Sequence, residues 1–293
     1  MLSTSAASDV EVAVACLECI EALSRSGVTQ AQMAVRNSGA VPHLIQMMSH
    51  SNARVAQVAA SLVSELCPGD VHNAEQLYES GGLVMFSEQL NSGDARSQLQ
   101  ALSALSQLSA NPQQAGAIVE NGCVPALLEL LDHPSQELKS YAAITFGNLC
   151  SSGAIPQRQL ESPATLPHLV NILSSSNGLA KGPAAGAIAS MSSRPELRRT
   201  VFEMGGLPGL VTLLSGDPDT SYHAVQAIAQ FAADEAFRTS LAETGGLGSL
   251  TPLLSSHLPH VQQCALSAIA NVSFISGAVG QLASSGALAH LGQ

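Results

Sequence analysis

The chain has 293 residues, of which 46% are hydrophobic, 11% charged and 3% aromatic, and its net charge is −11 at pH 7. The apolar share is too high for a disordered chain, and the acidic balance argues against a protein that binds nucleic acid through its phosphates. No apolar run approaches the ~20 residues of a membrane span, and residues 1–10 lack the basic start and apolar block of a signal peptide. We therefore expect a globular cytoplasmic chain, and its six cysteines fit a reducing compartment.

The first predicted element is a helix from Asp9 to Ser24, where Ser8 and Glu11 have the spacing of a capping box. This helix is apolar over more than one side. After it, the chain becomes repetitive.

A six-residue phrase recurs seven times, at starts separated by 42, 41, 42, 41, 40 and 41 residues. A clear copy is Gly122-Cys123-Val124-Pro125-Ala126-Leu127. Seven starts this regular indicate a repeat protein. The copies begin at Gly39, Gly81, Gly122, Ala164, Gly205, Gly245 and Gly286.

A second phrase, clearest at residues 141–150, carries apolar residues at three fixed positions that lie on one face of a helix. We expect these three columns to be buried. The last column holds Leu23, Leu66, Leu108, Leu149, Met191, Phe231 and Val272. Three positions earlier stand Ile20, Val63, Leu105, Phe146, Ile188, Ile228 and Ile269. Seven positions earlier stand Cys16, Ala59, Ala101, Ala142, Ala184, Ala224 and Ala265.

Each repeat therefore predicts three helices: a short first helix before the corner glycine, a second after it, and a longer third that carries the second phrase. Glycine can take the positive φ that ends the first helix, and the proline that often follows suits the first turn of the second. In this arrangement the chain resembles the armadillo-repeat family, through corners such as Gly39-Ala40-Val41-Pro42 and the run from Ala143 to Leu149, which ends in Gly-Asn-Leu. HEAT repeats have two helices per unit, and the glycine-rich corner favours armadillo repeats.

The resemblance covers about residues 9–291 and implies an all-α, right-handed superhelical solenoid whose third helices line a concave groove. We predict one domain over residues 1–293. It comprises an incomplete repeat 9–24, full repeats at about 28–67, 71–109, 112–150, 157–193, 195–233 and 236–273, and an incomplete repeat 276–293. Both ends look incomplete, so we expect a partner to cover at least one of them; the alternative is a sequence cut from a longer protein.

The fourth full repeat departs from the pattern. Its corner residue is Ala164, Pro156 and Pro163 flank its first helix, and Pro183 should make its third helix start late. We expect local irregularity here, and the alternative is a tolerated loop variant.

No residue cluster in the sequence predicts catalysis, a metal site or a cofactor. Cys16 and Cys19 form a lone CxxC, but both fall in small, packed columns, so we expect them and Cys67, Cys123 and Cys150 to be buried and slow to react. The histidines of the second helices lie in repeats too far apart to share a metal, and His257 and His260 lack a third ligand. We therefore expect that the protein is not an enzyme. The second-helix histidines are His43, His168 and His290.

The candidate protein-binding site follows from the resemblance. In the family, the residue just before the last apolar column of the third helix faces the groove, and amides and hydroxyls there can bond a bound backbone. We call this set the third-helix row: Glu65, Gln107, Asn148, Ser190, Gln230 and Asn271, with Ala22 in the opening helix. One turn earlier stand Glu18, Ser61, Ser103, Ile144, Gly186, Gln226 and Ser267. The alternative is a solvated concave face.

The leading functional hypothesis is a non-catalytic scaffold or adaptor in a hetero-complex, which binds other proteins through the groove, the ridges or the open ends. Nuclear-import adaptors of the family pair each groove Asn with a Trp, which this chain lacks, and neither row carries the Lys and Arg of the catenin type. Within the scaffold class we first expect a structural component of a large assembly such as the axoneme of a cilium or flagellum, because the Ala/Ser/Gly-rich, Lys-poor repeats resemble armadillo proteins of radial spokes and the central pair. The alternative is a soluble peptide-capturing adaptor in nuclear transport or ubiquitin ligation.

Overall fold

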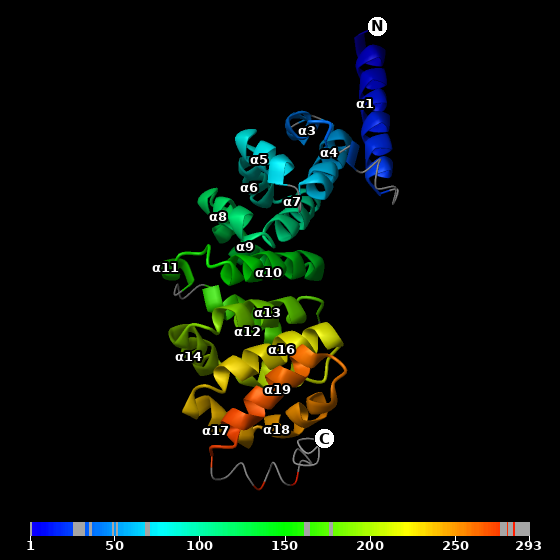
Figure 1. The fold of residues 1–293 in the computed structure, drawn as a ribbon. Helices are drawn as coiled ribbons and strands as arrows, with labels where there is room; N and C mark the ends of the chain where they lie inside the picture. The colour runs from blue at the N-terminus through cyan, green and yellow to red at the C-terminus, as the bar shows by residue number, and fades with distance from the viewer. Residues whose placement is uncertain are drawn as a thin grey trace. The chain divides into compact units, whose positions relative to one another are not determined.

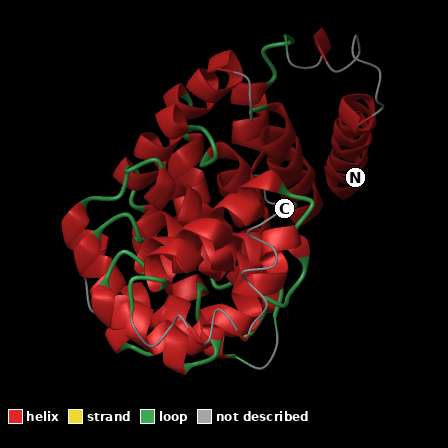
Figure 2. Ribbon diagram, turned by 60° about the horizontal axis from the view of Figure 1, so that its bottom comes forward, coloured by secondary structure: helices red, strands yellow, loops and turns green. Residues whose placement is uncertain are grey.

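The computed structural model describes residues 2–25, 33–34, 37–48, 50, 52–67, 71–160, 165–175, 178–275, 280 and 284. In this part of the chain, all regular structure is helical, and the helices are joined by turns and short loops (Figure 2). The chain divides into two compact units, residues 1–129 and 130–293.

The first unit contains one long opening helix and then sets of shorter ones. The third helices pack on one another in chain order, α1 against α4 and α4 against α7. The helices are α1 (Leu2–Arg25), α3 (Val41–Met48), α4 (Ala53–Leu66), α5 (Val71–Glu79), α6 (Gly82–Leu90), α7 (Ala95–Leu108), α8 (Pro112–Glu120) and α9 (Cys123–Leu130), whose last residue opens the second unit.

In the second unit, the third helices α10, α13, α16 and α19 pack on one another in that order, and the first helices α11, α14 and α17 follow one side of the unit (Figure 1). The helices are α10 (Gln136–Ser151), α11 (Gln157–Leu160), α12 (Thr165–Ser174), α13 (Lys181–Met191), α14 (Pro195–Glu203), α15 (Gly206–Leu213), α16 (Pro218–Phe231), α17 (Glu235–Glu243), α18 (Gly246–Leu250), the 3₁₀ helix η1 (Thr251–Ser255) and α19 (Pro259–Val272).

The corner glycines end the first helices as the sequence predicts. Gly81, Gly205 and Gly245 have φ of 74°, 78° and 73°, and the next residue begins the second helix in each repeat. Gly122 has φ of 74° at the equivalent corner between α8 and α9. A side chain is strained at this backbone angle, which explains why the corner repeats as glycine.

The apolar columns of the third helices form the core. Ala142, Phe146 and Leu149 of α10 have no exposed surface, and their equivalents in α4, α7, α13, α16 and α19 are at most 3% exposed. The opening helix is the exception, because Leu23 is 49% exposed and Cys16 is also exposed. Among the described helices, α1 packs chiefly on α4, so one side of its columns is more open.

One of the predicted helix starts is wrong and another is confirmed. α1 begins at Leu2 and runs through Ser8, so the predicted start at Asp9 and its capping box are wrong. Residues 2–8 contain no Pro or Gly that would stop a helix. The late start of the third helix at Pro183 is confirmed: α13 has 11 residues, whereas α10 has 16 and α16 has 14.

The first helix of this irregular repeat, α11, has four residues. Its predicted corner residue, Ala164, lies outside the described residues, as does nearly all of the predicted closing repeat 276–293. The expectation that the closing end is open therefore stays a prediction.

Candidate protein-binding surfaces

The third-helix row occupies accessible positions in both units. Gln107 on α7 and Gln230 on α16 are exposed, and the other four members are half-buried. In the second unit, Asn148, Ser190, Gln230 and Asn271 come from α10, α13, α16 and α19, which pack in that order. The row therefore places polar groups on four successive helices of one unit, each directly beside a buried column.

In the first unit, arginines partner the acidic members of the predicted rows. Arg25 donates to Glu65 and forms an ion pair with Glu21 at 2.9 Å, while Arg54 pairs with Glu18. As the sequence predicts, no Lys or Arg occupies a position of either row. The sequence did not predict that Arg25 and Arg54 would contact these rows, because both arginines lie outside the columns. The Arg25 and Arg54 side chains are 60% and 67% exposed, so each pair contributes at most about 1 kcal/mol.

A small polar hollow of about 210 Å³ lies beside these pairs in the first unit. Ser61 donates to Glu21 at 2.9 Å along its wall. Its other lining residues include Gln57, Gln100 and Ser103, so amides and hydroxyls face it from α4 and α7.

In the second unit, an aromatic group lies next to the third-helix row. The His223 ring of α16 covers Gly186 of α13, since a Cβ at Gly186 would lie 3.1 Å from its Nδ1 atom. The Tyr222 ring meets the His260 ring edge-on with centroids 4.6 Å apart. Burial lowers the pKa of His223, and the negative charges of Asp219 and Asp217 partly oppose this shift. Sequence reasoning missed this group, although adjacent Tyr and His in an otherwise Ala-rich helix were a visible signal.

Ser190 of the row has its hydroxyl engaged within the unit. It lies 2.6 Å from the Ser151 hydroxyl and donates to the Gly186 carbonyl oxygen at 2.9 Å. A ligand would therefore meet an ordered pair of hydroxyls between α10 and α13 rather than a lone side chain.

The cysteines divide by exposure. Cys67, Cys123 and Cys150 are buried as expected, but Cys16 and Cys19 are exposed, so the prediction that this pair is packed is wrong. Among the described helices, α1 packs chiefly on α4, so small residues on the other side of its columns stay open. Within the described residues, no three His, Cys, Asp or Glu side chains are placed to hold a metal ion.

His168, one of the predicted second-helix histidines, lies with its Nδ1 2.6 Å from an Asp132 carboxylate oxygen. His43 is exposed on α3, and His290 lies outside the described residues. None of the helices in the described ranges is long and apolar enough to span a membrane.

Sequence comparison finds armadillo repeats in two stretches. Residues 29–67 and 111–151 match the model of the Armadillo/beta-catenin-like repeat. Importin subunit alpha-1b of Oryza sativa subsp. japonica is 28% identical over 147 residues, which are 50% of this chain and 27% of that protein. The Armadillo segment polarity protein of Drosophila melanogaster is 33% identical over 93 residues, 31% of this chain and 11% of its own length. The chain thus spans less than a third of either relative.

Solved structures give the same fold over more of the chain. A designed armadillo repeat protein superimposes with a TM-score of 0.71 at 26% identity, covering 79% of this chain and 99% of its own. An engineered protein reaches a TM-score of 0.74 at 26% identity, covering 90% of this chain and 68% of its own. Another designed armadillo repeat protein, solved in complex with the peptide (KR)4, has a TM-score of 0.68 at 26% identity, covering 79% of this chain and 99% of its own. The chain therefore has the all-helical fold of armadillo-repeat solenoids, and two of its stretches match the repeat's sequence model.

Proposed function

We propose that the chain is a non-catalytic protein-interaction scaffold that binds an extended segment of a partner along its third helices. The observation that carries the proposal is the third-helix row of the second unit, where Asn148, Ser190, Gln230 and Asn271 stand on four successively packed helices. Successive amides and hydroxyls on a helical stack suit a ligand whose own backbone groups are unpaired.

The relatives favour one of the two finer hypotheses. Importin alpha subunits are among the similar proteins, and a designed relative is solved with a bound peptide, which support a peptide-capturing adaptor and, of its two settings, nuclear transport rather than ubiquitin ligation. A structural role in the ciliary axoneme rests on the Ala-, Ser- and Gly-rich composition alone. We therefore place the adaptor first, in a hetero-complex and in the cytoplasm.

A selection from a phage-displayed library of random short peptides tests the proposal. We expect some selected peptides to lose affinity when Gln230→Ala and Asn271→Ala are combined, because these residues stand on the adjacent helices α16 and α19. Two lost hydrogen bonds at about 1 kcal/mol each correspond to a roughly 30-fold weaker Kd.

The matched control is Thr212→Ala, an exposed change on α15 of the same unit. It should leave the affinity of these peptides unchanged. If every selected peptide has the same Kd for the double variant and the wild type, with both proteins folded by circular dichroism, the interface lies away from the third helices.

A further inference from the structure

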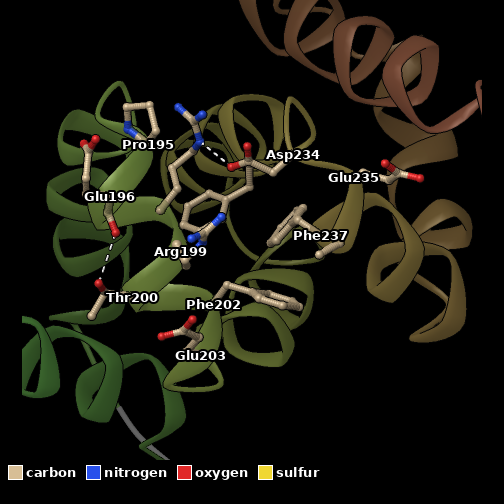
Figure 3. Close-up of a pocket in the computed structure, with 12 residues that line it drawn as sticks. Pro195, Glu196, Arg199, Thr200, Phe202, Glu203, Asp234, Glu235 and Phe237 are labelled. Carbon is tan, nitrogen blue, oxygen red and sulfur yellow. Dashed lines mark hydrogen bonds and ion pairs between the residues drawn. The ribbon is translucent and has the colours of Figure 1, made fainter.

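A second hollow, of about 950 Å³, lies in the second unit between the first helices α14 and α17 (Figure 3). We call it the first-helix pocket. Its floor is aromatic: Phe237 and Phe231 are at most 2% exposed, and Phe202 is half-buried. The ring centroids lie 5.7 Å apart for Phe202 and Phe237 and 4.7 Å apart for Phe231 and Phe237. A chain with only six phenylalanines places three of them here.

The corresponding junction of the first unit shows that the fold does not require this pocket. Between α5 and α8, the hollow is about 160 Å³ and is lined by polar side chains. Counted back from the corner glycine, Tyr78 stands where α14 has Phe202. In the same count, Gln113 and Gln114 of α8 stand where α17 has Ala236 and Phe237. With Ala and Phe in place of two amides, the junction of the second unit is more apolar, and its hollow is also larger.

The charges around the pocket are unbalanced. Arg198 of α14 and Asp234 pair at 2.9 Å, and Arg198 Nη1 also donates to the Ser192 carbonyl oxygen at 2.8 Å, so this pair is fixed at one edge. Three further carboxylates, those of Glu196, Glu203 and Glu235, line the pocket and are exposed.

Figure 3 shows these three acidic residues on different sides of the opening, with Phe202 and Phe237 between them. Arg199 supplies the one cationic group in the lining besides Arg198. The opening is therefore acidic around an aromatic floor, in a chain whose net charge is −11. A ligand that matches both properties has a bulky apolar part and positive charge beside it.

We propose that the first-helix pocket is a docking site for a short segment of a partner protein that packs one bulky apolar side chain against Phe202 and Phe237 and carries Lys or Arg on either side of it. The apolar anchor fills a hollow of the size that proteins use for specific ligands. The Lys or Arg residues of the segment lie near Glu196, Glu203 and Glu235. This attraction raises the rate of association and fixes the orientation of the segment. This site is formed mainly by the first helices, with Phe231 of α16 in its floor, and its lining contains no residue of the third-helix row.

The peptide selection described above tests the pocket with a different variant. Ala236→Gln places in the pocket the side chain that Gln113 supplies in the first unit, and Ala236 is exposed, so the core is not disturbed. We expect the selection to return peptides with a bulky apolar residue flanked by Lys or Arg, and Ala236→Gln to weaken their binding by about tenfold or more.

Two controls separate this site from the third-helix row. Ala95→Gln, an exposed change of the same kind at the start of α7, and the Gln230→Ala, Asn271→Ala double variant should both leave these peptides bound. Loss of binding in the double variant alone would assign the peptides to the third helices and overturn the pocket proposal while supporting the first one.

The charges give a second readout. Replacement of Glu196, Glu203 and Glu235 together by Gln should weaken the same peptides and flatten the dependence of their Kd on salt, since exposed charges are screened. Among the peptides that the Gln230→Ala, Asn271→Ala double variant still binds, acidic flanks, the lack of a bulky apolar residue, or a Kd unchanged by Ala236→Gln would each overturn the proposal.

Discussion

At the scale of single residues, the thiols differ most clearly in what surrounds them. Cys16 and Cys19 are exposed on α1, whereas Cys67, Cys123 and Cys150 are buried. Burial raises the pKa of Cys123 to about 11, despite a hydrogen bond with Ser87 that lowers it, and burial also raises the pKa of Cys150. Since the thiolate is the nucleophile, Cys123 and Cys150 are protected from reaction both by their burial and by their raised pKa.

We therefore expect a maleimide reagent to label Cys16 and Cys19 in a fast phase and the buried thiols only as the chain opens. Mass spectrometry of the native protein over time measures both. Replacement of Cys16 and Cys19 by Ser should remove the fast phase. A fast phase that persists in this double variant would show that the half-buried Cys264 or one of the buried thiols is accessible.

His223 makes stability depend on pH. Burial lowers its pKa in the folded chain, and the nearby Asp219 and Asp217 only partly oppose this. The unfolded chain therefore takes up a proton at a higher pH than the folded chain. The neutral ring contributes stability above the ordinary pKa of about 6.5, and this contribution is lost as the pH falls through the lowered pKa.

We expect His223→Gln to reduce the loss of melting temperature between neutral and mildly acidic pH. Thermal unfolding followed by circular dichroism at several pH values measures it, with His257→Gln, an exposed change, as the control. An equally steep loss in the His223→Gln variant would show that other groups cause the acid sensitivity.

At the scale of helices, α10 and α13 approach closely at a glycine. A Cβ at Gly147 would lie 3.2 Å from the Cα atom of Ala187 and 3.3 Å from its backbone nitrogen. Backbone atoms cannot move aside as a flexible side chain can. Gly147→Val should therefore push the two helices apart and lower the free energy of unfolding by about 1–3 kcal/mol.

The control for this prediction is Gly116→Val in α8, where a Cβ would meet no atom within 4 Å. It should leave stability unchanged or raise it, because a helix interior disfavours Gly. Urea unfolding of both variants compares them directly. Equal effects in the two variants would mean that close packing at Gly147 does not matter.

The helices also show what a sequence can predict. The third helices follow from columns such as Ala142, Phe146 and Leu149, because burial on one face imposes the spacing of a helix in every repeat. The opening helix is different, because its start depends on residues 2–8, which carry no stop signal and no repeat partner. The partner of Glu65 was not predictable either, since Arg25 lies outside every column.

The first-helix pocket could not be predicted from the sequence for a related reason. The short first helices share few positions beyond the corner glycine, so Phe202 and Ala236 do not stand out along the sequence. Their effect depends on packing one repeat against the next, where Phe202 meets Phe237. The columns predict the core of each repeat, and the surfaces between repeats become visible only when neighbouring helices are placed.

At the scale of the whole molecule, each repeat is stabilised mainly by its neighbours. In the second unit, α16 packs on α13 and α19, and in the first unit α4 packs on α1 and α7. Stability in such a stack is a sum of local terms, so a change in one repeat should spread to the next and then fade.

Ile228→Ala tests this property. Ile228 of α16 has no exposed surface, and removal of such a side chain costs about 2–5 kcal/mol. In native-state hydrogen exchange followed by mass spectrometry, we expect faster exchange in peptides from α13, α16 and α19 and unchanged exchange in α4 and α7. Thr212→Ala, an exposed change in the same unit, should alter neither set. A uniform increase along the chain would instead mean that all repeats open as one cooperative unit, because local opening would then cost more than global unfolding.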